Sequence, residues 1–399
     1  MSEYNLIIVL IILLAISVYK YKTAFNPLVI FNFIWALTLF LYEFKMSKIQ
    51  MDLNDRTIII FWLCILSYNI TFLVFSHLKH KKLIGIKFVK NLSIQQKIGI
   101  SKNIVIIIFM LEIIYSRGVP LIWLIMGTNK TYFDYGIPSL HGAWCGLVIC
   151  LGAYSLFKKN NDKWLYLGLG VIIISRQLLM SILVEGIIYS IYERNVLISK
   201  ADFKKIPKWV LVVIGGLSVA IFTIVGNFRS GKNVMNMVFQ AKEQYSNLPV
   251  SFKWIYSYMT FSISNFNHLV EITKGAVNNG ASMLSEFLPT VVLQMFNIKV
   301  TEQPYFLVSP NYTVSTYLPN IYLDFGVSGI TIFNCVIAAI GSKIYKNTIK
   351  QKNEVNMLLL ALYIHNIVFL FFQNFFLYLP VVIQFLYIPI IFSEKRDSN

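Results

Sequence analysis

Three arginines lie where apolar stretches of the chain end: Arg117 in YSRGVP, Arg176 in ISRQLL and Arg229 in GNFRSGK. Lys232 follows shortly after the last of them. A single arginine at such a place often only extends its charge toward lipid headgroups, but three from distant parts of the chain favour a shared role. Because a guanidinium binds phosphate oxygens through paired hydrogen bonds and keeps its charge in partly apolar surroundings, they predict a site for a lipid-linked phosphate or pyrophosphate.

A second set of reactive side chains recurs at helical spacing in the stretch FKWIYSYMTFSISNFNHLVEITK. Steps of three and four residues place its polar and aromatic members on one predicted helical face: Tyr258, Phe261, Asn265, His268 and Glu271. His268 and Glu271, one turn apart, have the residue types of a general base and its orienting carboxylate for a sugar hydroxyl, and the aromatic rings suit stacking on a sugar. A merely amphipathic surface with a solvated histidine is an equally good interpretation.

Other polar residues lie inside or beside apolar stretches. His141 in GIPSLHGAW is costly there unless it faces a cavity or bonds to water, and it is a second candidate base. Asp324 in YLDFGVSGI is either a substrate ligand or an acid favoured by the start of a helix. Glu112 and Glu185 interrupt apolar segments, and we expect each to pair with an arginine.

The composition defines the setting in which these residues act. Of 399 residues, 57% are hydrophobic and only 13% charged, and the mean hydropathy is +0.65. Apolar runs of roughly 20 residues are long enough to cross a bilayer as helices. We therefore predict an all-α, polytopic integral membrane protein, whose net charge of +17 reflects the side on which cations lie rather than binding to nucleic acid. The N-terminal stretch reads as a retained first span, because it lacks a cleavable leader.

Eleven membrane segments are predicted, with Trp164 to Tyr192 as the doubtful region. Basic connectors, KKNNDK and ERNVLISKADFKKIPK, flank that region, and short basic loops stay cytoplasmic, so it is predicted to be two short helices that turn near Ser175. One long tilted helix is the alternative. The predicted segments are 3–19, 26–44, 57–78, 103–116, 138–157, 164–175, 178–192, 209–226, 321–342, 356–373 and 375–392.

This topology places the N-terminus outside, the C-terminus inside and most of the 35 lysines and arginines on the cytoplasmic side. The chain reads as one domain, 1–399, in which residues 227–320 form a large external loop containing helices. The sequence has no GxGxxG, Walker, HExxH or CxxC motif, and the predicted external loop has no DxD pair, so we expect no cofactor and no metal. The four cysteines fall in apolar stretches, where we expect them to act as small hydrophobic residues.

Five short stretches resemble the oligosaccharide repeat-unit polymerases, the Wzy type of O-antigen and capsule polymerase. They are YGIPSLHG (135–142), SR (175–176), NFRSGK (227–232), YSYMTFSISNFNHLVE (256–271) and NYTVSTYLPNIYLDFGVSG (311–329). The resemblance implies a metal-independent glycosyltransferase of the GT-C type in the bacterial cytoplasmic membrane. Such an enzyme joins repeat units carried on undecaprenyl pyrophosphate at the outer face, beside a flippase and a chain-length regulator.

The resemblance also implies roles for individual residues. Arg176 and Arg229, with Arg117 and Lys232, would hold the pyrophosphate, and either His268, with Glu271, or His141 would act as the base. Substrate contacts are expected from Tyr258, Asn265 and Asp324. Three alternatives remain open: an O-antigen ligase, which differs only in its acceptor, a lipid-linked oligosaccharide flippase or other transporter, and a structural scaffold of a polysaccharide export complex.

Overall fold

The computed structural model describes residues 3–78, 92–158, 161–193, 232–288, 290–298 and 307–393. These residues form helices joined by turns, with one isolated bridge between Ser47 and Ala241 and no strand. In chain order the helices are α1 (Glu3–Tyr21), α2 (Pro27–Glu43), α3 (Asp55–His77), α4 (Ile94–Ser116), α5 (Pro120–Ile125), η1 (Tyr132–Asp134), α6 (Leu140–Ser155), α7 (Asp162–Ile172), α8 (Arg176–Glu193), α10 (Lys232–Phe239), η3 (Glu243–Tyr245), α11 (Val250–Ile272), α12 (Ala281–Phe287), α13 (Thr290–Met295), α14 (Pro319–Lys350), α15 (Glu354–Val368), α16 (Leu379–Val382) and α17 (Gln384–Phe392).

Four of the described helices are long and apolar enough to cross a membrane: α1, α3, α4 and α14. Shorter apolar helices lie at Pro27–Glu43, Leu140–Ser155, Glu354–Val368 and Leu379–Phe392. The predicted all-α class is therefore confirmed, and the apolar helices indicate a membrane-embedded protein. The number of spans and their sidedness stay predictions, and the predicted segment 209–226 lies outside the described residues.

The stretch from Trp164 to Tyr192 is divided into α7 and α8, as the basic connectors predicted. Ile174 adopts a left-handed conformation (φ 54°), and the Ser175 N–H donates to the Gly170 carbonyl, which ends α7. The Ser175 hydroxyl then accepts a hydrogen bond from the Leu178 N–H and caps α8. Arg176 thus becomes the first residue of α8.

Other predicted segments also differ from the structure at their ends. Segment 321–342 is the longer α14, Pro319–Lys350, and segment 356–373 is the shorter α15, Glu354–Val368. Residues 375–392 are a turn, in which the Asn374 side chain accepts from the Phe376 N–H, followed by two short helices, α16 and α17. Helix α4 begins at Ile94, earlier than predicted, because Ser93 and Gln96 form a reciprocal capping box.

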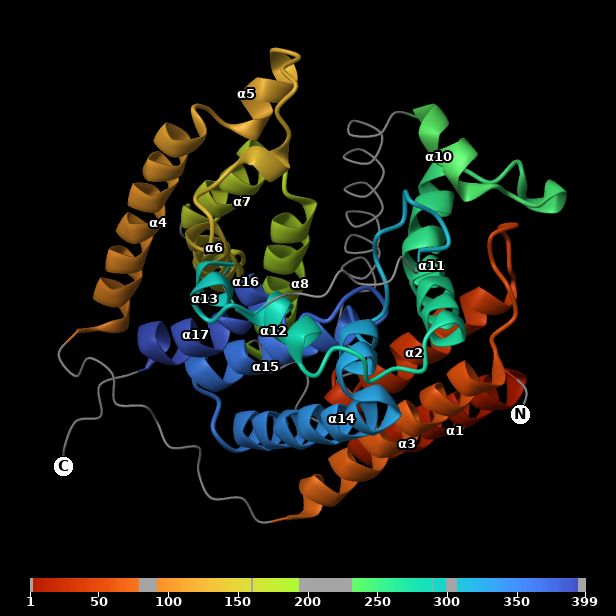
Figure 1. Cartoon of the computed structure of the whole chain (residues 1–399). Helices are drawn as coiled ribbons and strands as arrows, with labels where there is room; N and C mark the ends of the chain where they lie inside the picture. The colour runs from red at the N-terminus through yellow and green to blue at the C-terminus, as the bar shows by residue number, and fades with distance from the viewer. Residues whose placement is uncertain are drawn as a thin grey trace.

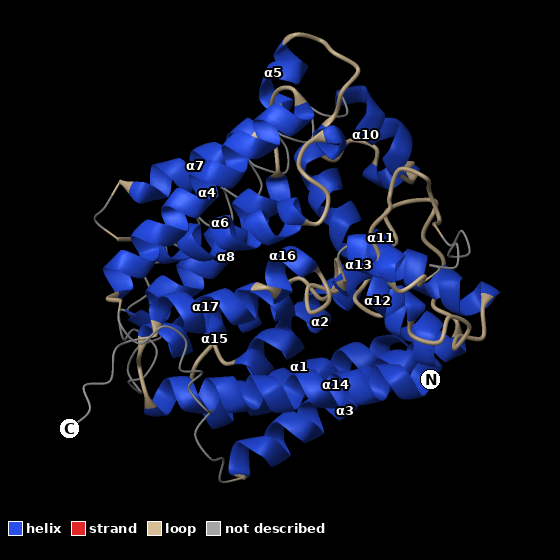
Figure 2. Ribbon diagram, turned by 60° about the vertical axis from the view of Figure 1, so that its left-hand side comes forward, coloured by secondary structure: helices blue, strands red, loops and turns tan. Residues whose placement is uncertain are grey.

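Figure 1 shows how these helices are arranged. Helices α1, α3 and α14 run across the base, α4 to α8 rise on one side, and α10 and α11 rise on the other. Figure 2, from another direction, again shows α1, α3 and α14 together. Helix α3 packs along α14, α1 packs on α2, and α8 packs against both α6 and α15.

Helix α11 lies in the predicted external loop, yet it packs against α2, α3 and α10. It forms a small core with the connector that follows α2 and with the segment before α14, made of Met46, Met235, Phe239, Trp254, Tyr256, Phe261 and Tyr312. The Tyr256 hydroxyl joins these parts, because it accepts from the Met46 N–H and donates to the Gln50 side chain. Much of the predicted loop is therefore a folded layer on the helices.

Helix α14 is interrupted at Gly326, whose dihedral angles (φ 62°, ψ −152°) suit glycine alone. In an unbroken helix the carbonyls of Tyr322 and Leu323 would accept from residues four positions further on. Here Tyr322 O accepts from the Ala276 N–H, and Leu323 O accepts from the Val277 and Asn278 N–H groups. The break therefore attaches the segment after α11 to α14.

Replacing Gly326 by alanine tests this strained junction. A Cβ there would meet the Ala276 Cβ at 3.6 Å, which is ordinary contact, so the cost comes from the backbone conformation and not from a clash. We expect Gly326→Ala to lower the free energy of unfolding by about 1–3 kcal/mol, measured by thermal unfolding in detergent.

Gly99→Ala is the matched control, because Gly99 lies within α4 with nothing within 4 Å of its Cβ position. We expect that change to be neutral or to stabilise by up to about 1 kcal/mol. Equal effects of the two substitutions would contradict the special role of Gly326.

Candidate functional site

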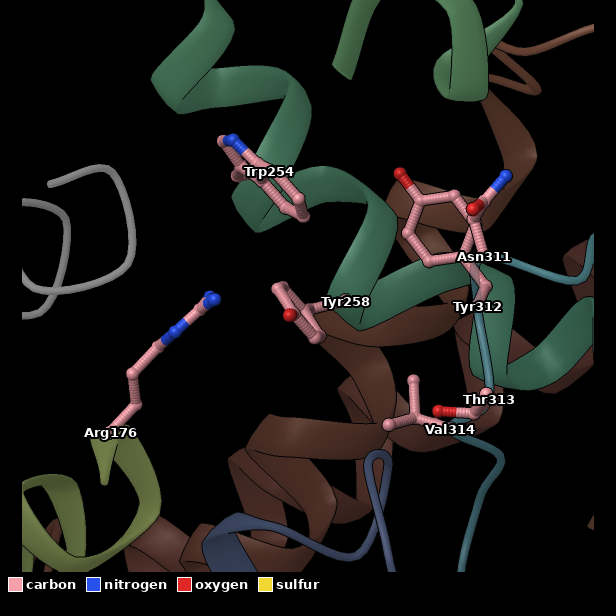
Figure 3. A pocket seen from close by; sticks show the side chains of 7 residues that line it. All are labelled: Arg176, Trp254, Tyr258, Asn311, Tyr312, Thr313 and Val314. Carbon is pink, nitrogen blue, oxygen red and sulfur yellow. The ribbon is translucent and has the colours of Figure 1, made fainter. Parts of the chain in front are cut away.

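A cavity of about 150 Å³ lies where α8, α11 and the segment before α14 meet. A volume of this size has room for a phosphate group or part of a sugar ring but not for a whole oligosaccharide. Figure 3 shows the Arg176 guanidinium extending from α8 toward the rings of Tyr258 and Trp254 on α11. The lining residues are Arg176, Trp254, Tyr258, Asn311, Tyr312, Thr313 and Val314.

One wall of the cavity is an aromatic shelf, which we define as Trp254 and Tyr258. Their rings are stacked with centroids 5.9 Å apart and planes 23° apart, as expected one helical turn from each other. Phe372 supports the shelf from the turn after α15, with its ring 5.5 Å from that of Tyr258. Trp254 is 8% exposed and Tyr258 is half-buried, and where such flat rings line a cavity they offer an apolar face to the C–H groups of a sugar ring.

Another wall is the segment 311–314, which is held in place mainly by one buried side chain, Asn265. The Asn265 amide donates to the carbonyls of Tyr312 and Val314 at 2.9 and 2.7 Å, and its oxygen accepts from the Val308 N–H at 2.8 Å. The Ser315 hydroxyl adds a bond to the Ser262 carbonyl. These hydrogen bonds satisfy backbone N–H and carbonyl groups of the segment 308–314, which would otherwise lie unpaired beside α11.

Tyr312 points inward from this segment and joins the small core. Its ring meets Phe261 edge-on at 4.4 Å, and its hydroxyl donates to the Met235 sulfur at 3.5 Å. Burial raises the pKa of the Tyr312 hydroxyl, so that group stays protonated at neutral pH.

Arg176 supplies the positive charge of the site. It is half-buried and stands at the N-terminal end of α8, where the unpaired backbone N–H groups of a helix also favour an anion. With the aromatic shelf opposite, the cavity has the chemistry to hold a phosphate at the guanidinium and an adjoining sugar against the rings.

The other predicted cations are not brought into this cavity by the described residues. Arg117 is exposed, and it ends α4 in a left-handed conformation (φ 57°). Arg229 lies outside the described residues. Of Lys232 only the backbone is described, as the first residue of α10. The predicted meeting of Arg176 with Arg229 therefore stays a prediction.

His268 and Glu271 lie toward the far end of α11. The His268 Nδ1 is 3.6 Å from a Glu271 carboxylate oxygen, and the Glu271 side chain is 61% exposed. At the helical rise per residue, His268 lies about 15 Å along α11 from Tyr258. The dyad thus exists as a loose pair, but its position on α11 separates it from the cavity.

Two predicted substrate ligands, Asn265 and Asp324, form hydrogen bonds to backbone groups of the protein instead. Asn265 is fully buried, and all of its described bonds hold the lining segment 308–314. Asp324 is 2% exposed, and its carboxylate accepts from the N–H groups of Ser282 and Met283. Asp324 is therefore a cap, of α12 and not of its own helix.

The acids inside apolar helices pair with histidines, and the prediction of arginine partners was wrong. Glu112 on α4 lies 3.0 Å from His141 Nδ1 on α6. Glu185 on α8 lies 3.4 Å from His365 Nδ1 on α15. Both histidines are far away in the chain, so no local spacing indicated the pairs.

Sequence reasoning assigned roles to Arg176 and Tyr258 but none to Trp254 or to the individual residues 311–314 of the cavity lining. Trp254 lies one turn before Tyr258 on the predicted face, and that spacing is a signal that could have found it. Residues 311–314 show no periodic pattern from which their place in the cavity wall could be predicted. Among the described residues, no group of three or more histidine, cysteine or acidic side chains is arranged so that it could hold a metal ion.

Comparisons with protein-family models, with curated proteins and with solved structures find no match for this chain. Its function must therefore be inferred from its own residues.

The Asn265→Ala substitution tests how the cavity wall is held. It would leave two carbonyls and one N–H without this partner, and each such buried group costs about 1–3 kcal/mol. We expect the segment 308–314 to open locally, seen as faster amide hydrogen exchange at Val308 and earlier proteolysis there.

Asn311→Ala is the control, because Asn311 lies in the same segment and is exposed. We expect it to change stability by less than about 0.5 kcal/mol. Unchanged exchange at Val308 in Asn265→Ala would show that other contacts hold the wall.

Proposed function

We propose that this protein is a membrane glycosyltransferase that polymerises oligosaccharide repeat units carried on undecaprenyl pyrophosphate. One observation supports it most. The cavity joins residues from three of the five stretches that resemble the repeat-unit polymerases: Arg176 from SR, Tyr258 from YSYMTFSISNFNHLVE, and residues 311–314 from NYTVSTYLPNIYLDFGVSG. A guanidinium opposite an aromatic shelf suits a sugar linked to phosphate.

In the proposed reaction, the non-reducing-end hydroxyl of an incoming unit attacks the anomeric carbon of the growing chain. The bond from that carbon to the pyrophosphate oxygen breaks, and undecaprenyl pyrophosphate leaves. Arg176 stabilises the negative charge that develops on the leaving oxygen, where a fixed cation in a partly buried site acts most strongly. Trp254 and Tyr258 hold the adjoining sugar ring.

The hydroxyl proton must leave late in this reaction, because a good leaving group lets bond breaking run ahead of attack. The described lining residues include no histidine or carboxylate. His268 and His141 remain the proposed bases, and a substrate as long as an oligosaccharide would have to bring the hydroxyl to one of them. The outer face of a bacterial cytoplasmic membrane is the proposed place of reaction.

Arg176→Ala tests the proposed leaving-group role. We expect a loss of about 10² to 10³ in rate, seen as the disappearance of long-chain polymer on a gel while single repeat units still reach the surface. Arg176→Lys should recover only part of the polymer, because lysine keeps the charge without the paired hydrogen bonds. The same loss is predicted for Arg229→Ala.

Arg117→Ala is the matched control, since Arg117 also stands at a helix end but is exposed and away from the cavity lining. Its chain-length pattern should stay normal. A normal pattern in Arg176→Ala at comparable protein level would overturn the proposal.

Deletion of the gene separates the alternatives. Loss of long chains with single units retained supports a polymerase, and loss of both points to a flippase or an earlier step. Loss of every unit from the lipid A core, with long chains still made on the lipid carrier, would indicate a ligase. An unaltered polymer would exclude all three.

A further inference from the structure

A row of three side chains with acid, base and nucleophile chemistry crosses from α4 to α6, apart from the cavity lining. His141 Nδ1 lies 3.0 and 3.1 Å from the two oxygens of Glu112, and His141 Nε2 lies 3.5 Å from the Cys145 sulfur. Cys145 follows His141 by one helical turn, so both are on the same face of α6. The carboxylate, imidazole and thiol therefore stand in sequence.

The His141 ring is held in one orientation by its neighbours. Trp144 stacks on the imidazole at 5.6 Å with planes 23° apart, and the Tyr135 ring meets it edge-on at 5.6 Å. Gly136 (φ +99°) lies so close that a Cβ there would be 2.5 Å from the imidazole. Rotation that would turn the ring nitrogens away from Glu112 and Cys145 is thereby opposed.

This orientation determines what the imidazole can do. Glu112 is fully buried, and a carboxylate there accepts the Nδ1 hydrogen, which leaves the lone pair of a neutral imidazole on Nε2. Nε2 faces the thiol, so it can take the thiol proton. A plain Glu–His pair would explain how the buried acid is tolerated, but it does not require a thiol at the second nitrogen.

The Tyr135 hydroxyl is a hydrogen-bond donor near these three side chains, because the Tyr135 ring contacts His141. Tyr135 is 5% exposed, and its hydroxyl is buried. Among the described residues this hydroxyl has no hydrogen-bond partner. Burial first, and then the nearby Glu112 and Cys145, raise the pKa of that hydroxyl, so it keeps its proton. A buried donor without an acceptor is costly, and an oxygen that carries negative charge would satisfy it.

We propose that these residues form a second reactive site, an acyl-transfer site in which Cys145 is the nucleophile, His141 the base and Glu112 the residue that positions the base. The Cys145 sulfur attacks the carbonyl carbon of an acyl ester, and His141 accepts the thiol proton. The carbonyl oxygen becomes an oxyanion, to which the Tyr135 hydroxyl donates. The ester C–O bond then breaks, and the departing alkoxide takes the proton from His141, which leaves a thioester on Cys145.

The low exposure of the thiol favours a short acyl group as the substrate. The His141 side chain is 29% exposed, whereas Cys145 is 9% exposed, so the imidazole is the more accessible of the two groups. Attack by water or by a second hydroxyl on the thioester would release the acyl group and return the thiol. This site shares His141 with one of the two candidate bases of the proposed glycosyl transfer, whereas Cys145 and Glu112 take no part in that transfer.

The test uses the purified full-length chain in detergent with p-nitrophenyl acetate as the probe. We expect rapid release of nitrophenolate and an acetyl group on Cys145, located by mass spectrometry and removed by neutral hydroxylamine as a thioester is. Cys150 is the internal control, because it lies on the same helix and is 1% exposed. Acetylation of Cys150 as fast as Cys145, or of neither, in the unaltered protein would overturn the proposal.

Variants then assign the roles. His141→Gln should slow Cys145 acetylation by about a hundredfold, and Glu112→Gln by at least about tenfold, with partial recovery in Glu112→Asp. A substitution that disturbs folding would change the acetylation rate of Cys150 as well. The ratio of the acetylation rates of Cys145 and Cys150 therefore separates an effect on the chemistry from an effect on folding. An unchanged ratio in both His141→Gln and Glu112→Gln would refute the roles. Arg176→Ala tests the glycosyl-transfer proposal separately, because it should remove the long-chain polymer and leave Cys145 acetylation unchanged.

Discussion

The cavity depends on one constraint, which is that backbone polar groups beside apolar helices must be hydrogen-bonded. Asn265 meets it for the segment 308–314, with three bonds from one fully buried amide. Each unpaired group would cost about 1–3 kcal/mol, so the segment has few other ways to lie against α11. Its side chains Asn311 and Thr313 are presented to the cavity as a result.

The same constraint explains the irregular places in the helices. Gly326 breaks α14, and the carbonyls of Tyr322 and Leu323 bind the segment after α11. Asp324 then caps α12 from the same turn. Elsewhere, Ser175 ends one helix and begins the next, which sets Arg176 at the cavity. The interruption between α7 and α8 thus helps to position the candidate site, and the break in α14 attaches the segment after α11.

Several polar side chains inside the apolar bundle are paired across helices. Asn32 and Asn69 exchange amide hydrogen bonds at 2.9 Å between α2 and α3. His365 joins Glu185 and Ser181 across α8 and α15, with distances of 3.4 and 3.1 Å. Such bonds act as attachments between helices in a setting without water. The His141 row uses the same chemistry but differs in that its imidazole is partly exposed, whereas Glu112 is buried.

Local patterns predicted the elements that depend on neighbours in the chain. The basic connectors around 164–192 predicted the pair α7 and α8, because charge does not cross the bilayer readily. The spacing in 252–274 predicted α11, because the helical period is a local property. The residues predicted to share one face of α11 do lie at helical spacing on it. The middle residues of that face, Phe261 and Asn265, are fully buried, whereas Tyr258 and Glu271 near its ends are not.

Composition and periodicity by themselves determined that the chain is helical and apolar, and they identified Arg176, Tyr258 and His141 as unusual. Tertiary structure alone decided their partners. The Trp254 and Tyr258 shelf faces Arg176 across a cavity, and Glu112 lies against His141, through contacts between segments distant in sequence. Periodicity reports which face of a helix a residue occupies, but which helix covers that face depends on packing of the whole chain, and no local spacing carries that information.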